Sequence, residues 1–187
     1  MITLVLGGAR SGKSELAERL ASRHGPPITY VATGVATDRD MAERIAAHRK
    51  RRPASWATVE CGTDLAGALA ATHGTVLLDA LGTWVARLDG FEPDVAGLCH
   101  ALRARRGATV VVSEEVGLGV HPATDAGRRF RDQLGALNQA VSAVAGAAYL
   151  VVAGRVVTLG PLVEAAATEK TSDAAQGAPP EGGASGA

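Results

Sequence analysis

Short apolar segments alternate with longer amphipathic segments along most of the chain. The apolar runs cover residues 2–6, 28–32, 76–79, 109–113 and 149–153, and Gly or Pro bounds each of them. Because these runs are too short and too uniformly apolar for amphipathic helices, they predict buried strands. Apolar residues recur at spacings of three and four over residues 13–23, 38–50, 64–71, 94–106 and 124–147, which predicts helices there. Asp38 and Thr124 are candidate caps for two of these helices.

Strands that alternate with helices are typical of βαβ units and of a mostly parallel sheet. We therefore predict an α/β fold of three layers, with the sheet between two layers of helices. The pattern ends near residue 160, because no large apolar side chain follows Val163 and the segment is rich in Ala, Glu, Gly, Ser and Pro. Such a segment cannot offset the entropy of ordering its backbone. We predict one domain over residues 1–160 and a disordered tail over residues 161–187.

Composition excludes several classes of partner. Lys and Arg total 19, as do Asp and Glu, so no net charge attracts the chain to nucleic acid or to an anionic membrane. The residues Phe, Trp and Tyr make up only 3% of the chain, which leaves few rings for stacking on bases. We expect no nucleic-acid partner.

The cysteines and the apolar stretches of the chain indicate the cellular compartment of the protein. Cys61 and Cys99 form no Cys-x-x-Cys pair and have no clustered histidines nearby, which argues against a zinc site or a disulfide framework. The first apolar run is too short for a signal peptide. The stretch over residues 143–154 falls short of the roughly 20 apolar residues that cross a bilayer. We expect a cytoplasmic protein with no membrane span.

A phosphate-binding motif lies between the first predicted strand and the first predicted helix. The eight residues match G-x-x-x-x-G-K-[ST], and a strand before and a helix after are the context that this motif requires. Its glycines allow backbone N–H groups to point at phosphate oxygens, and the helix N-terminus adds positive potential. We therefore predict a P-loop NTPase that binds a nucleoside triphosphate through Gly7, Gly8, Ala9, Arg10, Ser11, Gly12, Lys13 and Ser14.

Three side chains are candidates for handling the phosphates and their metal ion. Lys13 is expected to bridge the β and γ phosphates, and Ser14 to offer its hydroxyl to Mg²⁺. Asp79, at the end of an apolar strand, is the candidate partner of Ser14 in holding that ion, in the Walker B manner. The alternative role for Asp79 is a cap for the following helix.

The P-loop alone does not choose among an ATPase, a GTPase switch, a kinase and a transferase. No Asn-Lys-x-Asp sequence for reading guanine occurs in the chain, which disfavours a Ras-like switch. His48 stands beside Arg49, Lys50, Arg51 and Arg52, just before a proline that ends the helix. A neutral imidazole there can attack phosphorus, but a histidine in a basic helix is more often a surface residue or an anion contact.

Several further motifs, in a fixed order, resemble one family of enzymes. They are Gly7-Gly-Ala-Arg-Ser-Gly-Lys-Ser14, His48-Arg-x-x-Arg-Pro-x-x-Trp56-x-Thr58-x-Glu60, Asp79-x-Leu-x-x-Trp84, Glu115-Val-Gly-Leu-Gly-Val-x-Pro122, Gly127-Arg-Arg-Phe-Arg-Asp132 and Leu137-Asn-Gln139. In this respect the chain resembles the bifunctional adenosylcobinamide kinases and adenosylcobinamide-phosphate guanylyltransferases of cobalamin biosynthesis. The resemblance covers about residues 1–160.

The resemblance implies a RecA-like P-loop fold and two reactions. In the first, the γ-phosphoryl group of ATP or GTP passes to the aminopropanol hydroxyl of adenosylcobinamide. In the second, His48 attacks the α-phosphorus of GTP, carries GMP as a phosphoramidate, and transfers it to give adenosylcobinamide-GDP. His48 and Lys13 are then the catalytic residues.

The same resemblance implies further nucleotide-binding residues and an oligomer. Arg49 and Arg52 are expected to orient phosphates, and Glu60 to lie near the nucleotide unless it only pairs with an arginine. The loop Thr33-Gly34-Val35 is expected beside them, and a homotrimer is implied. Glu114 departs from the family pattern, in which we expect Asn at this position.

Two other readings remain open from the residues themselves. One is a P-loop small-molecule kinase without guanylyl transfer, in which His48 and its arginines only bind phosphates. The other is a RecA-like ATP-binding module within a larger assembly, which the balanced charge of the chain disfavours as a motor on nucleic acid.

Overall fold

The computed structural model describes residues 1–36 and 38–161, so the predicted tail lies outside the described residues apart from Pro161. Within them, seven strands form one sheet in the order β3-β2-β4-β5-β1-β6-β7. All neighbours are parallel except β6 and β7, which are antiparallel. The strands are β1 (Ile2–Gly7), β2 (Ile28–Ala32), β3 (Ala57–Glu60), β4 (Thr75–Asp79), β5 (Thr109–Glu114), β6 (Ala147–Val152) and β7 (Arg155–Leu159).

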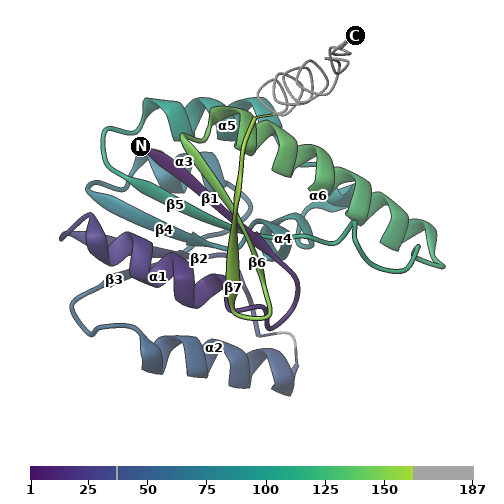
Figure 1. Cartoon of the computed structure of the whole chain (residues 1–187), viewed down its shortest axis with the longest axis horizontal. Helices are drawn as coiled ribbons and strands as arrows, with labels where there is room; N and C mark the ends of the chain where they lie inside the picture. Colours follow the sequence, from purple (N-terminus) through teal and green to yellow (C-terminus); the bar gives the residue numbers. More distant parts are fainter. Residues whose placement is uncertain (37, 162–187) are drawn as a thin grey trace, which may run out of the picture.

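Helices connect the parallel strands and lie on both faces of the sheet (Figure 1). Side chains cap three of them, because Asp64, Asp94 and Thr124 each accept a hydrogen bond from the backbone N–H three residues later. The predicted cap at Thr124 is thereby confirmed. The helices are α1 (Lys13–Arg23), α2 (Arg39–Arg51), α3 (Leu65–Ala70), α4 (Leu81–Val85), the 3₁₀ turn η1 (Asp89–Phe91), α5 (Val95–Ala104) and α6 (Asp125–Val144).

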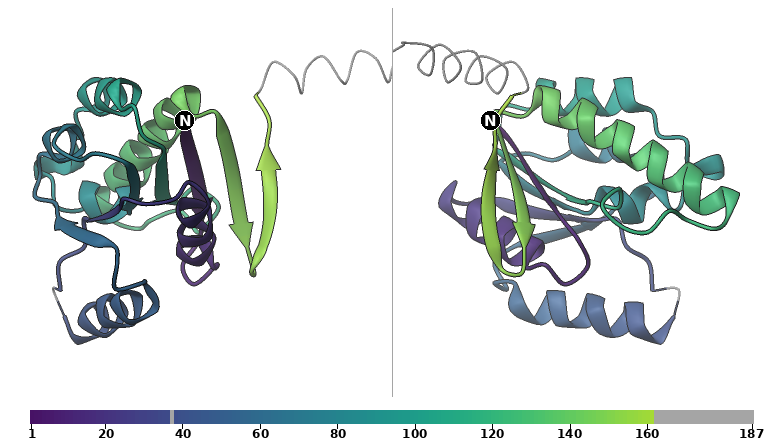
Figure 2. Two further views of the ribbon diagram at one scale, coloured as in Figure 1. Left: turned by 90° about the vertical axis from the view of Figure 1, so that its left-hand side faces the viewer. Right: turned by 45° about the vertical axis from the view of Figure 1, so that its right-hand side comes forward.

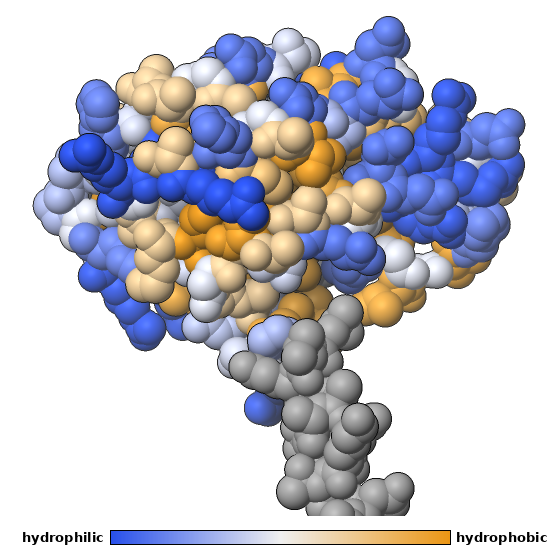
Figure 3. All heavy atoms as spheres, turned by 90° about the horizontal axis from the view of Figure 1, so that it is seen from above, coloured by the Kyte–Doolittle hydropathy of each residue, from blue (hydrophilic) through white to orange (hydrophobic). Residues whose placement is uncertain are grey.

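Alternating side chains of the buried strands divide the core into two layers. Leu4 and Leu6 of β1 pack with α3, α4, α5 and α6, whereas Val5 faces the other side and packs with Ala17 and Ala21 of α1. These side chains are almost fully buried. The predicted three-layer α/β fold with a mostly parallel sheet is therefore confirmed. Figure 3 shows the molecule from the side of α5 and α6, where hydrophobic patches lie between hydrophilic side chains.

Several elements differ from the sequence prediction, and three of these differences have a clear physical cause. The strand β3 lies at the sheet edge with every residue exposed, so it lacks the buried apolar run that identifies a strand. The strand β7 is exposed as well and follows β6 through a tight turn in which Ala153 and Gly154 both have positive φ. The helix α6 ends at Val144 rather than at residue 147, because Ala147 already pairs with Thr3 of β1.

Two elements lie at the periphery of the molecule. The hairpin of β6 and β7 forms one edge of the sheet, and the helix α2 lies below the sheet and apart from the body of the molecule (Figure 2). None of the α2 side chains that the structure describes is buried. Among the described residues, no helix is long and apolar enough to pass through a membrane.

Candidate active site

The P-loop forms the tight turn between β1 and α1 that its glycines predict. A Cβ atom on Gly7 would lie 2.7 Å from the carbonyl oxygen of Val151, so only glycine fits there. Gly12 has a φ of 97° and precedes the first turn of α1, where no side chain caps the helix. The N–H groups of that first turn are therefore left for an anion. Lys13 lies across the loop and donates a hydrogen bond from Nζ to the Gly8 carbonyl oxygen at 3.2 Å.

Polar groups gather at the carboxyl ends of the parallel strands. The strands β1, β4 and β5 end at Gly7, Asp79 and Glu114, and β2 leads directly into Thr33 and Gly34. In an open α/β sheet, ligands bind at this edge. The fold thus brings together residues that are far apart in the chain.

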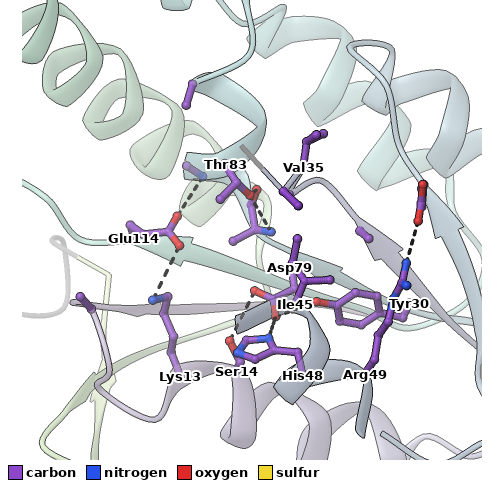
Figure 4. Close-up of a pocket in the computed structure, with 18 of the residues that line it drawn as sticks. Lys13, Ser14, Tyr30, Val35, Ile45, His48, Arg49, Asp79, Thr83 and Glu114 are labelled. Atoms are coloured by element: carbon purple, nitrogen blue, oxygen red, sulfur yellow. Dashed lines mark hydrogen bonds and ion pairs between the residues drawn. The ribbon is translucent and has the colours of Figure 1, made fainter. Parts of the chain in front are cut away.

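Asp79 is the most highly connected side chain of the site (Figure 4). Ser14 donates to its Oδ1 at 3.4 Å, and the Tyr30 hydroxyl donates to its Oδ2 at 3.1 Å. His48 places Nδ1 at 3.5 Å from the same Oδ2. Burial opposes ionisation of Asp79, but His48, Tyr30 and Ser14 outweigh it, so the pKa of Asp79 is lowered from its ordinary value. Asp79 is therefore an ionised acceptor that joins the P-loop to α2.

Tyr30 is a member of this cluster that the sequence analysis missed. Its place in the apolar run of β2 indicates only a core residue, and its side chain is indeed buried. Burial and the Asp79 carboxylate raise the pKa of Tyr30, so the phenol stays a neutral donor. The signal in the sequence is the hydroxyl itself, because a buried Tyr O–H needs a partner.

Glu114 lies at the end of the Lys13 side chain (Figure 4). Its Oε1 is 3.7 Å from Lys13 Nζ, and its Oε2 accepts a hydrogen bond from the Gly82 backbone N–H at 2.9 Å. Burial raises the pKa of Glu114, with the Lys13 ammonium opposing and the Asp79 carboxylate adding to the shift. The Lys13 ammonium therefore pairs with the Glu114 carboxylate in the described structure.

One face of α2 closes the cleft above the P-loop. Ile45 and His48 are three residues apart, which places them on the same side of α2, and Arg52 follows directly after the end of the helix. All three line the cleft, and the His48 side chain is 31% exposed. His48 is the candidate nucleophile of the sequence analysis. In the structure its ring contacts Asp79, and the P-loop serine Ser14 contacts the same carboxylate.

The cations next to His48 do not surround its ring. Arg49 pairs with Glu60 at 2.7 Å, and Arg51 forms two bonds to Glu18 at 2.7 and 2.8 Å. The Arg52 guanidinium lies 3.5 Å above the Tyr30 ring, a cation–π contact. The group that faces the imidazole is instead the Asp79 carboxylate.

The cleft has a volume of about 580 Å³. Most of the predicted site residues line it, namely Gly8, Ala9, Lys13, Ser14, Gly34, Val35, His48, Arg49, Arg52, Glu60 and Asp79. Other lining residues were not predicted as site residues, among them Tyr30, Ile45, Thr83, Glu114, Val116 and Phe130. A neighbouring hollow of about 490 Å³ is lined by Trp56 and Thr58 and shares Arg49, Arg52 and Glu60 with the cleft.

Five predicted nucleotide-binding residues do not line this cleft, and Thr33 is the clearest case. Its side chain is fully buried, and its hydroxyl bonds to the backbone of Ala80 and to Thr83. Its carbonyl oxygen accepts a hydrogen bond from Arg87. The Thr33 side chain therefore holds the β2 loop against Ala80, and a contact of this residue with the nucleotide stays a prediction. The other four belong to the P-loop turn and are Gly7, Arg10, Ser11 and Gly12.

Two unsatisfied polar atoms and an oxygen donor set fit a nucleotide and its metal ion. Among the described residues, Ser11 Oγ and Arg52 Nη1 are buried without a hydrogen-bond partner. The Ser14 hydroxyl and the Asp79 carboxylate supply the oxygen ligands that Mg²⁺ prefers, and their 3.4 Å separation places both at one spot. The described residues contain no group of three or more His, Cys, Asp or Glu side chains that could hold a metal ion alone. Ser14 and Asp79 therefore suit a metal ion whose remaining ligands come from the phosphates of a bound nucleotide.

Comparison with known proteins identifies one protein family and several similar proteins. The family described as cobinamide kinase / cobinamide phosphate guanyltransferase matches residues 3–159. The bifunctional adenosylcobalamin biosynthesis protein CobP of Pseudomonas aeruginosa is 43% identical over 154 residues, which cover 76% of this chain and 87% of that protein. The bifunctional adenosylcobalamin biosynthesis protein CobU of Salmonella typhimurium is 34% identical over 176 residues, or 82% of this chain and 97% of that protein.

Among solved structures, the flagellar accessory protein FlaH of Methanocaldococcus jannaschii has a TM-score of 0.47 at 12% identity. That likeness covers 83% of this chain and 74% of FlaH.

Proposed function

Because the chain belongs to the cobinamide kinase / cobinamide phosphate guanyltransferase family, we propose that its one cleft performs two reactions in turn. The first phosphorylates the aminopropanol hydroxyl of adenosylcobinamide with ATP or GTP. The second transfers GMP from GTP through His48 to the phosphate just made and yields adenosylcobinamide-GDP. The observation that carries this proposal is that His48 and the P-loop serine contact the same carboxylate, that of Asp79.

In the kinase reaction the cradle and Lys13 supply binding and charge. Backbone N–H groups of the P-loop and of the first turn of α1 bind the phosphate oxygens, and the Lys13 ammonium moves from the Gly8 carbonyl to the β and γ phosphates. Ser14 and Asp79 would hold Mg²⁺, which neutralises charge on the phosphates when bound. The oxygen of the substrate hydroxyl bonds to the γ-phosphorus and its proton passes to the solvent, while the bond to the nucleoside diphosphate breaks and the diphosphate leaves.

In the guanylyl reaction the nucleophile comes from α2. The His48 ring attacks the α-phosphorus of GTP and pyrophosphate leaves, which gives a phosphoramidate. An oxygen of the cobinamide phosphate then attacks the same phosphorus and His48 leaves. The covalent step divides one difficult displacement between two anions into two easier ones. Arg52, which has an unpaired Nη1, is placed to bind the phosphates, and Arg49 is placed to do so once it leaves Glu60.

The residues that line the cleft suggest how the two substrates are arranged. Glu60, which pairs with Arg49, lines the cleft together with Gly34 and Val35, and we propose that these three residues contact the nucleoside. Val116 and Phe130 line the cleft together with Glu114, whose partner Lys13 is expected at the γ-phosphate. We propose that the aminopropanol arm of the corrinoid enters beside these two apolar side chains.

The covalent intermediate provides the most direct test. Wild-type protein, His48→Ala and the control His73→Ala are incubated with Mg²⁺ and GTP labelled at the α-phosphate, then quenched in alkali, in which phosphoramidates survive. His73 is exposed and lines a separate hollow between α3 and α5, so its loss leaves the cleft intact. Label is expected on wild type and on His73→Ala, is absent from His48→Ala, and is released by cobinamide phosphate. An unlabelled wild-type protein would leave a P-loop kinase without guanylyl transfer as the better account.

A further inference from the structure

The two nitrogens of the His48 ring have different surroundings. Nδ1 is 3.5 Å from Asp79 Oδ2, and the Asp79 side chain is only 8% exposed. The described contacts of His48 include no ion pair or hydrogen bond from Nε2, and the ring lines the cleft in which the phosphates are expected. A role for Nε2 in attacking GTP rests on the proposed guanylyl transfer, whereas the orientation of the ring is a property of the unliganded protein.

A neutral imidazole has one N–H and one lone pair, and its neighbours decide which nitrogen has which. Asp79 Oδ2 already accepts a hydrogen bond from the Tyr30 hydroxyl, and the ring nitrogen that faces this acceptor oxygen is Nδ1, which is therefore the nitrogen placed to donate. We propose that Asp79 positions His48 with its proton on Nδ1, and that Nε2 is therefore the atom that attacks GTP and carries GMP. Asp79 is in this view a positioning residue for guanylyl transfer as well as a metal ligand for both reactions.

Asp79 is held firmly enough for this role. It ends β4, which pairs along its length with β2, and Asp79 itself is opposite Ala32. The Tyr30 hydroxyl, also from β2, donates to the oxygen that His48 faces. Arg52 stacks on the Tyr30 ring and donates from Nε to the His48 carbonyl oxygen at 3.2 Å, which fixes the backbone of α2 over the same cluster. The carboxylate belongs to the rigid sheet, and the ring on α2 docks against it.

The chemistry of the step agrees with this arrangement. The Nε2 lone pair forms the bond to the α-phosphorus, while the bond from that phosphorus to the bridging oxygen breaks and its electron pair leaves with pyrophosphate. The ring then has hydrogen on Nδ1 and phosphorus on Nε2, and it is positively charged. The Asp79 carboxylate stabilises that charge without taking the proton. When the cobinamide phosphate attacks, the N–P electron pair returns to Nε2 and the starting tautomer is restored.

The tautomer can be measured without any substrate. Protein labelled with ¹⁵N-histidine, free of nucleotide and metal, is studied by long-range ¹H–¹⁵N correlation NMR at a pH at which the His48 ring is neutral. The proton is expected on Nδ1 in wild type and in Ser14→Ala, whereas Asp79→Asn shifts the population toward the Nε2–H form. Ser14→Ala is the matched control, because it removes the other polar partner of Asp79 on the metal side and leaves Oδ2 unchanged. A wild-type ring protonated on Nε2 overturns the proposal.

The position of GMP on the ring is the second readout. The ³¹P–¹⁵N coupling of the guanylylated protein is expected on Nε2, and a coupling to Nδ1 overturns the proposal. Asp79→Asn is expected to slow adduct formation about 100-fold or more, a loss that excess Mg²⁺ does not restore. If no adduct forms in wild type, the proposed guanylyl transfer is contradicted, while the tautomer measurement still decides the orienting role of Asp79.

Discussion

At the scale of single residues, Asp79 contacts both the phosphate-binding loop and the helix that supplies the proposed nucleophile. Ser14 belongs to the P-loop and His48 to α2, and the two side chains meet only through this carboxylate. Sequence reasoning placed Asp79 beside Ser14, because a strand end that follows an apolar run is where a P-loop enzyme holds its metal. It could not place His48 there, since the contact joins residues 31 positions apart and depends on how α2 lies over the sheet.

Glu114 gives a prediction that is independent of catalysis. Its pKa in the folded protein is raised above the ordinary value of 4.5, chiefly by burial. The native state therefore binds more protons than the unfolded state between these two pKa values, and the free energy of unfolding falls as pH rises through that window. Glu114→Gln removes this loss, because the amide oxygen still accepts the Gly82 N–H and does not ionise.

We expect Glu114→Gln to gain stability relative to wild type as pH rises above about 4.5, with the difference levelling off above the folded-state pKa. Urea unfolding of both proteins over a pH series measures it. A difference that stays constant or shrinks with rising pH contradicts the assignment of Glu114 as a carboxyl group disfavoured by burial.

At the scale of elements, α2 differs from every other helix that flanks the sheet. The described side chains of α2 supply no member of either core layer, and Ile45 and His48 are only half-buried. Ion pairs hold it instead, with Arg51 bound to Glu18 of α1 and Arg49 bound to Glu60 of β3. A helix attached in this way can leave and return at little cost in buried apolar area. This suits a nucleophile that is needed in only one of two reactions.

The ion pair between Glu18 and Arg51 offers a way to loosen α2 without touching the cleft. We expect Glu18→Gln to accelerate hydrogen exchange over residues 39–51 and to slow formation of the GMP adduct roughly two- to fivefold, as for a pair worth about 0.5–1 kcal/mol. The kinase reaction should keep its rate. Glu43→Gln is the matched control, because it breaks the exposed pair with Arg39 within α2 and touches no other element. Equal effects of the two variants on the adduct would contradict this role for the pair.

The strands that sequence could identify are those with buried residues. The strands β1, β2, β4 and β5 appear as apolar runs because both of their faces are covered by helices. Ala57–Glu60 and Arg155–Leu159 are exposed throughout, so their residues match a loop as well as a strand. The five-residue helix α4 is too short to show a helical period.

At the scale of the whole molecule, the carboxyl ends of the strands bring the P-loop and the strand-end side chains into one cleft. The P-loop could be predicted because a local sequence encodes it, and the strand-end residues followed from the topology. Tyr30 and Glu114 could not be assigned, because their roles come from neighbours on other strands rather than from local pattern. The trimer implied by the family resemblance and the cytoplasmic location stay predictions.

The central claim is that one cleft performs two reactions and that His48 serves only the second. The most direct test gives His48→Ala and wild type the same mixture of adenosylcobinamide, GTP and Mg²⁺, and follows both corrinoid products by chromatography. Wild type is expected to form adenosylcobinamide-GDP, while His48→Ala accumulates the phosphorylated corrinoid at a similar rate and forms no guanylylated product. Loss of both products in the variant, or continued formation of adenosylcobinamide-GDP, would contradict the account.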